Sequence, residues 1–342
     1  MDSIVNQTLK DIEIIVVNDG STDDTLEKLL IYANKDNRVK IVDKKNEGLI
    51  EARKSGLDAA SGEFLMFVDG DDWIDINACE KLYKKSTKLN LDILCYGLYH
   101  AFDDYLELKN IYDFKLAKGE EYLKLVLLNK ARANAVLQLL RKEFLIRNDI
   151  IFPSNITYAE DLAITVTLAC NDPVVGTLNE PLYYYYQREN SVTNKVSNKV
   201  FDVELAVDSI RKEMEQKGYM EKYYSEFEYL MFIHLYYHRV IAVSYTGEIH
   251  RALYDKWREK KLNMKNNKYY KDFVSNITIR EKLKLKKQYL KKELYKALSI
   301  ISGKESPWGT LTGVRPSKIV HEMLEKEYNE FIVYWLPKMQ DN

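Results

Sequence analysis

Short runs of β-branched and other apolar residues alternate with helical patterns over the first 70 residues of the chain. The runs at 12–17 and 64–68 are typical of strands that are buried on both faces, and 39–42 is expected to form another strand. The segments expected to form helices, 24–34 and 48–60, lie between them. Strands that are joined through helices in this way run parallel, because the crossover is long and right-handed. We therefore expect an α/β fold with a mixed, mostly parallel sheet and flanking helices.

Acidic turns follow the first and the third of these strands. Asp19 lies just beyond the first strand, and the segment DGDD, which contains Asp69, Asp71 and Asp72, follows the third. The carboxyl ends of parallel strands form one edge of an open sheet, and ligands bind at that edge. We therefore expect these carboxylates to share one rim of the sheet.

The DGDD segment supplies three carboxylates within four residues. Carboxylate oxygens are the ligands that Mg2+ and Mn2+ prefer, and substrate phosphates often complete their coordination shell. The alternative is a solvated acidic turn that caps the next helix, since Asp-rich turns after strands are common. For Asp19 the corresponding alternative is an Asx-turn with backbone N–H groups.

Beyond residue 100, helical patterns are expected at 118–147, 158–170 and 201–270. An aromatic run at 182–187 is strand-like. We find no internal repeat.

Four more polar residues have both a functional and an ordinary interpretation. Glu160 and Asp161 open an expected helix, where they complement the helix dipole or where one of them acts as a general base. Arg188 either stabilises leaving phosphate charge or is an ordinary loop arginine. Arg53, taken alone, is interpreted as a surface arginine of an expected helix.

Composition limits the class of protein. Apolar residues make up 46% and charged residues 30% of the 342 residues, which excludes disorder over most of the chain. No run of ~20 apolar residues is present, and the N-terminus lacks the features of a signal peptide. Three widely spaced cysteines fit a reducing cytosol. The phosphate-binding loop, GxGxxG and GxSxG motifs are absent, and His234 and His238 lack the glutamate of a metalloprotease helix.

Two stretches together carry a more specific signal than any single motif. The first contains SIVNQTLKDIEIIVVNDGSTDDT and NEGLIEARKSGLDAASGEFLMFVDGDDWI, and the second contains YAEDLAITVTL and PLYYYYQRENSVTN. Over about residues 2–200, and in the same order, they resemble the nucleotide-sugar-binding and acceptor halves of family 2 glycosyltransferases with the GT-A fold. The helical continuation to about residue 285 is typical of the bacterial surface-polysaccharide branch of that family.

On the donor side, the resemblance implies a role for each acidic turn. Asp19 corresponds to the family's acid that contacts the uridine, and Arg53 corresponds to the arginine that contacts the uracil. The metal-binding DxD motif corresponds to Asp69 and Asp71, with Asp72 adjacent. The implied cofactor is Mn2+ or Mg2+, and the implied donor is a nucleotide sugar with UDP as its nucleotide.

On the acceptor side, the family's catalytic base corresponds to Asp161, supported by Glu160, and Arg188 stands where the family often places a basic residue near the phosphates. The implied reaction is an inverting, single-displacement transfer in which Asp161 takes the proton of the acceptor hydroxyl. The metal neutralises charge on the departing diphosphate. The implied acceptor is a glycan or a lipid-linked glycan in cell-surface polysaccharide or glycolipid synthesis.

Both ends of the chain depart from the family. The family's first strand runs centrally in the sheet, whereas Met1 begins inside the helix that should follow it. We therefore expect an N-terminally truncated enzyme in which two strands have unpaired edges. Residues 290–326 resemble a segment that precedes the radical-SAM core of oxygen-independent coproporphyrinogen oxidase-like proteins, without the cysteine triad of an iron–sulfur site. The expected division is 1–200 for the GT-A domain, 201–289 for a helical extension and 290–342 for a tail of different origin.

Two alternatives to an active glycosyltransferase stay open. The missing strand favours a catalytically inactive remnant that binds a partner or a membrane. A nucleotidyltransferase is disfavoured, because its glycine-rich activating loop is absent. Residues 251–296 contain sixteen Lys and Arg against five Asp and Glu, and the expected helix at 280–300 either rests on anionic lipid or has a solvated face. We expect a cytoplasmic protein, peripheral at the inner face of the cell membrane, that binds no nucleic acid.

Overall fold

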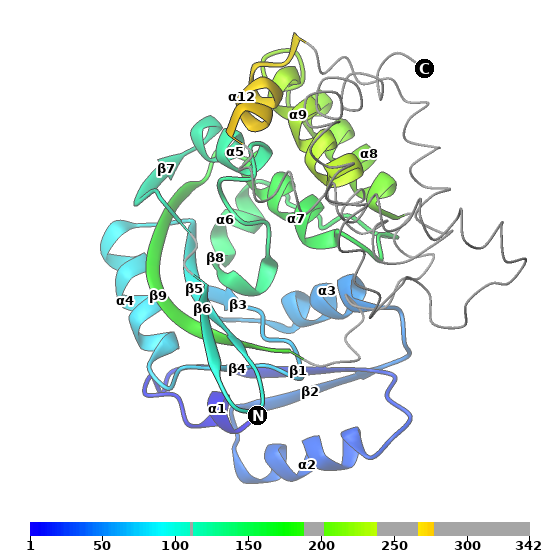
Figure 1. The fold of residues 1–342 in the computed structure, drawn as a ribbon. Coiled ribbons are helices and arrows are strands. Elements are labelled where there is room, and N and C mark those ends of the chain that lie inside the picture. The colour runs from blue at the N-terminus through cyan, green and yellow to red at the C-terminus, as the bar shows by residue number, and fades with distance from the viewer. Residues whose placement is uncertain (110–111, 188–201, 238–265, 277–342) are drawn as a thin grey trace, which may run out of the picture. The chain divides into compact units, whose positions relative to one another are not determined.

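The computed structural model describes residues 1–109, 112–187, 202–237 and 266–276 (Figure 1). The chain divides into two compact units, 1–224 and 225–342. Both sheets belong to the first unit, which also contains every site residue that the sequence predicted, except that Arg188 lies outside the described residues.

The first sheet is small and parallel. It consists of β1 (Ile14–Asp19) and β2 (Val39–Lys44), which α2 (Thr25–Lys35) connects. The short helix α1 (Asp2–Val5) precedes this sheet, and α3 (Leu49–Ala59) follows it. These strands and the helices α2 and α3 begin and end within two residues of the boundaries expected from the sequence.

The second sheet has seven strands. In spatial order its main path is β3 (Phe64–Met66), β8 (Gln138–Arg141), β5 (Ile93–Ala101), β9 (Val174–Tyr186) and β4 (Trp73–Ile74). In addition, β6 (Leu106–Lys109) pairs with β5, and β7 (Leu116–Lys118) pairs with β9. β5 and β9 are parallel, and β8 runs antiparallel between β3 and β5. The carboxyl ends of β3, β5 and β9 therefore share one edge of the sheet.

The expected α/β fold with a mixed sheet and flanking helices is confirmed. Helices cover both faces of the large sheet: α4 (Ala78–Leu89) lies on one side, and α5 (Glu120–Leu127), α6 (Lys142–Arg147) and α7 (Glu160–Ala169) lie on the other (Figure 1). Parallel pairs form a smaller part of the sheets than expected, because β4, β6, β7 and β8 all run antiparallel to their neighbours.

One expected helical segment is wrong in part. Residues 118–147 contain α5 and α6, but the stretch between them includes the 3-10 turn η1 (Ala135–Leu137) and strand β8. All four residues of β8 are buried, because the strand is covered on both faces. A strand buried on both faces carries no alternating pattern, so its apolar residues cannot be told from those of a buried helix.

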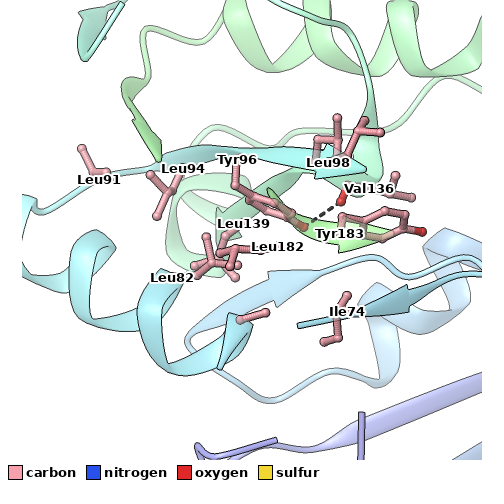
Figure 2. Packing of buried hydrophobic residues seen from close by; sticks show 12 residues of the cluster. Ile74, Leu82, Leu91, Leu94, Tyr96, Leu98, Val136, Leu139, Leu182 and Tyr183 are labelled. Atoms are coloured by element: carbon pink, nitrogen blue, oxygen red, sulfur yellow. Dashed lines mark hydrogen bonds between the residues drawn. The ribbon is translucent and has the colours of Figure 1, made fainter. Parts of the chain in front are cut away.

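One hydrophobic core cluster of the first unit lies between the large sheet and α4. Leu82 of α4 packs with Leu94 and Tyr96 of β5 and with Tyr183 of β9, and all four side chains are fully buried (Figure 2). The hydroxyl of Tyr96 donates to the backbone carbonyl of Val136 at 2.6 Å, so this buried polar group is paired. Phe64 and Met66 of β3 pack against this cluster, so the core helps to hold the strand that precedes the DGDD turn.

Strands β1 and β3 each pair on one side only among the described residues, β1 with β2 and β3 with β8. The Glu13 side chain joins the segments that precede these strands. Its carboxylate accepts hydrogen bonds from the backbone N–H groups of Ser61 at 2.5 Å and Gly62 at 2.6 Å. A side chain thus connects the two sheets at this point, where the strands themselves have open edges.

The first unit extends past the expected domain boundary at residue 200. Helix α8 (Val203–Gln216) packs on α7, and Nζ of Lys217 donates to Oδ1 of Asn171 at 2.6 Å. The helix that the sequence placed in a separate extension is therefore part of the same compact unit as the sheets.

The described part of the second unit is helical, as expected for 201–270. It contains α9 (Tyr224–Met231), the π-helical segment η3 (Phe232–Tyr237) and α12 (Lys268–Asn276). The Phe232 ring packs against Tyr270 and Phe273, with ring centroids at 5.0 and 5.4 Å. The basic helix expected at 280–300 and the tail at 290–342 lie outside the described residues. None of the helices in the described ranges is both long and apolar enough to cross a membrane.

Candidate active site

Three charged side chains from separate elements meet beside the carboxyl end of β3. Arg53 comes from α3, Asp69 from the turn after β3, and Asp161 from the first turn of α7. Nη1 of Arg53 lies 2.7 Å from Oδ1 of Asp161, and Nη2 lies 3.5 Å from Oδ1 of Asp69. The Arg53 side chain is only 5% exposed, so this arginine is not the surface residue that its sequence position alone suggested.

The two carboxylates are partly open to solvent, whereas the arginine between them is not. The Asp161 side chain is 26% exposed and that of Asp69 is 33% exposed. The guanidinium also lies over the Phe67 ring, with Cζ 5.7 Å from the ring centroid. Its Nε is buried without a hydrogen-bond partner. The site therefore has a buried cation that presents two carboxylates toward solvent.

Burial and the Arg53 charge act on the pKa of Asp69 in opposite directions, and the charges of Asp161 and Asp71 act in the same direction as burial. Desolvation raises the pKa of Asp69, and the Arg53 charge partly offsets that effect. The pKa of Glu160, beside Asp161, is also raised, first by burial and then by the charge of Asp161. A rim that gathers several acids next to one arginine favours a bound cation or a ligand that brings one.

Asp19 holds the loop in front of α3. Its two carboxylate oxygens accept hydrogen bonds from the backbone N–H groups of Glu47 at 3.0 Å and Gly48 at 2.8 Å. Gly48 has a φ of +92°, a conformation that other residues rarely adopt. As in an Asx-turn, the Asp19 carboxylate accepts hydrogen bonds from backbone N–H groups. The donors belong to the loop before α3, however, and not to the turn that contains Asp19. Asp19 fixes the start of the helix that carries Arg53.

Asp72 is tied to the protein through both oxygens. Oδ2 accepts from the Tyr183 hydroxyl at 2.7 Å, and Oδ1 accepts from the Tyr186 backbone N–H at 2.8 Å. The Tyr183 hydroxyl in turn accepts from the Asp69 backbone N–H at 3.1 Å. Burial raises the pKa of Asp72 to about 6. Asp72 is buried, and the two hydrogen bonds that it accepts fix the DGDD turn on β9. Its expected part in metal binding stays a prediction.

The remaining acids of the DGDD turn fit a divalent cation that shares its shell with a substrate. Asp71 is exposed and Asp69 is partly exposed, and both offer the hard oxygen ligands that Mg2+ and Mn2+ prefer. The described residues include no group of three or more metal-ligating side chains placed to hold an ion by themselves.

The backbone before Asp161 has an unusual conformation. Ala159 has a φ of +61°, and the other described non-glycine residues with positive φ are all Asn or Asp. A left-handed alanine costs about 1–2 kcal/mol. The bend turns the chain into α7, so that Glu160 and Asp161 stand at the start of that helix. Backbone strain of this kind occurs preferentially at functional sites.

The structure brings together some of the residues that the sequence predicted and adds one. Arg53, Asp69 and Asp161 meet directly, whereas Asp19 supports the site through α3, and Arg188 and His238 lie outside the described residues. Sequence reasoning missed Tyr183. The aromatic run at 182–187 was recognised as a strand, but nothing in the local pattern indicates that its second residue contacts a turn more than a hundred positions earlier.

Comparisons with known proteins agree with this architecture. The model of the family described as Glycosyl transferase family 2 matches residues 1–148. EpsH of Bacillus subtilis is 28% identical over 240 residues, which are 68% of this chain and 70% of that protein. EpsJ of the same organism is 33% identical over 198 residues, and the cholesterol galactosyltransferase of Borreliella burgdorferi is 34% identical over 205 residues. The chain spans 58% of the former and 57% of the latter.

Solved structures show the same fold. S. aureus TarS in complex with UDP-GlcNAc superposes with a TM-score of 0.62 at 21% sequence identity, over 82% of this chain and 77% of that chain. TarS in complex with UDP gives a TM-score of 0.58 over 76% of this chain and 73% of that chain. The chain has the fold of these solved glycosyltransferase structures. Its sequence is similar to family 2 glycosyltransferases over residues 1–148 and to the curated relatives named above.

Proposed function

We propose that this chain transfers a sugar from a UDP-sugar donor to a hydroxyl group of a glycan or lipid-linked acceptor, with inversion at the anomeric carbon. The observation that carries the proposal is the position of Arg53 between Asp69 and Asp161. One carboxylate follows a strand at the ligand-binding edge of the sheet, and the other is a solvent-accessible acid of the kind that can take a proton. The UDP and UDP-GlcNAc complexes of TarS support the choice of donor nucleotide.

Asp161 is the proposed general base. It removes the proton of the acceptor hydroxyl while that oxygen bonds to the anomeric carbon, and the bond from that carbon to the UDP oxygen breaks. The Arg53 guanidinium orients the Asp161 carboxylate from the buried side, which leaves its exposed side for the acceptor. One base is sufficient, because an inverting displacement forms no covalent intermediate with the enzyme.

The donor diphosphate belongs at the DGDD turn. Asp69 and Asp71 would hold a Mn2+ or Mg2+ ion together with phosphate oxygens. When bound, that ion supplies positive charge opposite the diphosphate that leaves. Asp19 and Asp72 act indirectly, since the first fixes the start of α3 and the second fixes the DGDD turn on β9.

The proposed acceptor and location are supported by the sequence alone. Many acceptors of this family are lipid-linked, and the basic segment 251–296 suits an anionic membrane surface on the cytoplasmic side. Most of that segment lies outside the described residues. Cosedimentation of the full chain with phosphatidylglycerol vesicles, compared with phosphatidylcholine vesicles, tests this part of the proposal separately from catalysis.

The test of the central proposal is UDP binding and UDP release by the full chain. We expect calorimetry to show UDP binding that depends on Mn2+ and is lost in Asp71→Ala. Asp161→Asn should retain UDP binding but release UDP from a UDP-sugar and acceptor about 100-fold to 10,000-fold more slowly. Asp58→Asn, an exposed aspartate at the far end of α3, is the matched control and should behave like the native protein. Binding of UDP that is indifferent to Mn2+ and to Asp71 would refute the proposed donor site.

A second candidate function is a folded remnant that binds ligands or partners without turnover. Within the described residues β1 and β3 each pair on one side only, and this favours the second candidate, because unpaired strand edges destabilise a sheet. The two candidates differ in one measurement. A remnant leaves every UDP-sugar intact under conditions in which UDP itself binds, whereas an enzyme releases UDP.

A further inference from the structure

Three aromatic rings from neighbouring strands stack beside the DGDD turn. Tyr184 of β9 lies opposite Trp73 of β4 and opposite Tyr99 of β5 in the strand register. The Tyr184 ring is 5.4 Å from each of the other two, with interplanar angles of 10° to Trp73 and 29° to Tyr99. We call Tyr99, Tyr184 and Trp73 the aromatic row.

The aromatic row belongs to the outward-facing side of these strands. Ile74 follows Trp73 along β4, and Tyr183 precedes Tyr184 along β9. Both belong to the core: Ile74 is 3% exposed and Tyr183 is fully buried. By contrast, Trp73 is 37% exposed, and Tyr184 and Tyr99 are partly exposed. Polar residues are the usual choice for a strand face that is open to water, so a row of large rings there indicates a binding surface.

The aromatic row is held next to the candidate active site. Trp73 directly follows Asp72, whose oxygens accept hydrogen bonds from Tyr183 and Tyr186 on either side of Tyr184 along β9. Tyr99 and Tyr184 lie near the carboxyl ends of β5 and β9, at the same edge of the sheet as Asp69. The contacts that fix the DGDD turn therefore also fix the rings.

The surroundings of the aromatic row are polar. Nζ of Lys81 pairs with Oε2 of Glu180 at 2.7 Å, and both side chains are more than 40% exposed. The pKa of Tyr184 is raised, first by burial and then by the charge of Asp75, whereas the charge of Lys81 lowers it. A flat apolar centre with hydrogen-bonding groups at its rim matches a pyranose ring, which has an apolar C–H face and a polar edge of hydroxyl groups. It does not match a lipid chain, which has no polar edge.

We propose that the aromatic row binds the acceptor glycan, with sugar rings stacked on Trp73 and Tyr184. This inference rests on the proposed function, because it assigns the acceptor of that reaction to a surface beside the donor turn. The aromatic row binds the sugar units of the acceptor that do not carry the attacking hydroxyl. An oligosaccharide therefore binds more tightly than a single sugar. Its rings do not take part in the chemical step.

The test is glycan binding by the full chain, followed by the intrinsic fluorescence of tryptophan and by calorimetry. The probes are tetrasaccharides of β-linked glucose, β-linked N-acetylglucosamine and β-linked galactose at millimolar concentrations. We expect at least one of them to bind and to bind about tenfold more weakly in Trp73→Ala and in Tyr184→Ala. Trp73→Phe keeps an aromatic ring and should lose less than Trp73→Ala.

The matched control is Tyr105→Ala. Tyr105 is also an exposed tyrosine, at 54%, and stacks on Phe102 with ring centroids at 4.3 Å, but it lies outside the aromatic row. Its removal should leave glycan binding unchanged. Manganese-dependent UDP binding, measured on each variant, shows whether the DGDD turn of that variant is folded. If an alanine variant is not folded there, Trp73→Phe and Tyr184→Phe are tested in its place.

The outcomes separate this inference from the proposed function. Native protein that binds UDP but none of the tetrasaccharides overturns the inference alone, as does glycan binding that survives the loss of Trp73 and Tyr184. Failure to bind UDP refutes the donor site and leaves the glycan titration valid. If Trp73→Ala instead converts a dimer into a monomer in sedimentation and leaves glycan binding unchanged, the row is a self-association surface and the inference is wrong.

Discussion

Arg53 on α3 and Asp161 on α7 form an ion pair with 2.7 Å between Nη1 and Oδ1, although 108 positions separate them in the sequence. The same guanidinium reaches Asp69 at 3.5 Å. A single buried cation therefore joins the donor turn to the proposed base. The arrangement couples the two carboxylates. If the charge of Asp69 or Asp161 changes, the electrostatic interaction of Arg53 with the other carboxylate changes as well.

Replacement of Arg53 by methionine should affect both stability and rate. The variant leaves Asp69 and Asp161 without their shared cation, and breaking a fully buried pair costs about 3–5 kcal/mol. Because these carboxylates are 33% and 26% exposed, we expect a smaller loss, about 2 kcal/mol in the free energy of unfolding. UDP release should slow about 100-fold, since Asp161 is no longer held in place.

Arg147→Met is the matched control for this variant. Arg147 also pairs with a buried aspartate, Asp92, at 2.6 Å, and lies over the Phe144 ring at 5.4 Å, but it does not contact the candidate site. Denaturant unfolding and UDP release are measured on both variants. A native rate of release in Arg53→Met would contradict the role that we assign to this arginine.

Replacement of Gly20 by alanine should disturb the loop in front of α3. Gly20 has a φ of +71°, and a Cβ added there would lie 2.6 Å from the backbone nitrogen of Asn46. The left-handed conformation alone costs about 1–2 kcal/mol for alanine, and the clash is with backbone that cannot move freely. We expect thermal unfolding to show a loss of at least about 2 kcal/mol. Gly70→Ala, where an added Cβ meets no atom within 4 Å, should cost much less. Equal losses at the two positions would show that the loops are not in close contact.

Glu13 should make stability depend on pH in the acid range. Partial burial acts to raise the pKa of Glu13, but hydrogen bonds from Lys40, Ser61 and Gly62 outweigh it and lower the pKa to about 2. A carboxyl with a lowered folded-state pKa stabilises the protein above its ordinary value of 4.5, and this stability is lost as the pH falls from about 4.5 to about 2. Solvent screening limits the effect to about 1–2 kcal/mol.

The measurement for Glu13 is the free energy of unfolding of Glu13→Gln at several pH values. The variant should be less stable than the native protein near neutral pH, and the difference should shrink as the pH approaches the lowered pKa of Glu13. Glu27→Gln, on the exposed side of α2, is the control and should show no such convergence. A difference between Glu13→Gln and native protein that stays constant with pH would show that the carboxylate charge is not responsible.

Local patterns in the sequence predict much of this fold. The apolar runs identify β1, β2 and β3, and acidic turns mark the ends of β1 and β3, because each signal lies within a few residues of the element it describes. Strand β8 was taken for part of a helix, since burial on both faces removes the alternation that distinguishes a strand. The order of strands in the large sheet depends on pairings between distant segments, which no local pattern contains.

The candidate site shows the same division. The sequence places Asp19 and Asp69 at strand ends, and the family resemblance adds Arg53 and Asp161. Arg53 has no local feature that indicates burial, because its partners come from the turn after β3 and from α7. For the same reason the contact that occupies Asp72 could not be predicted: its donors lie on β9, more than a hundred residues further along the chain.

A strand supplied between β1 and β3 should stabilise the first unit. Each of these strands pairs on one side only among the described residues, and Glu13 joins the segments in front of them by side-chain hydrogen bonds alone. We expect fusion of a six-residue β-branched strand ahead of Met1, through a Gly/Ser linker, to raise the melting temperature by roughly 4–8 °C, on the order of 2 kcal/mol. UDP affinity should rise as well, because the added ladder holds the loop of Asp19 and the DGDD turn in fixed relation.

The control for the added strand is the same fusion with two of its residues changed to proline. Proline removes the N–H donors that a central strand needs, so this version should melt at the temperature of the unfused chain. Both fusions are compared by calorimetry in the absence and presence of UDP. If the proline version stabilises the chain as much as the intact strand, the gain does not come from ladder hydrogen bonds, and the hypothesis that an additional strand completes one continuous sheet is wrong. A gain in melting temperature without a gain in UDP affinity would mean that the open edges weaken the fold but do not disturb the donor site.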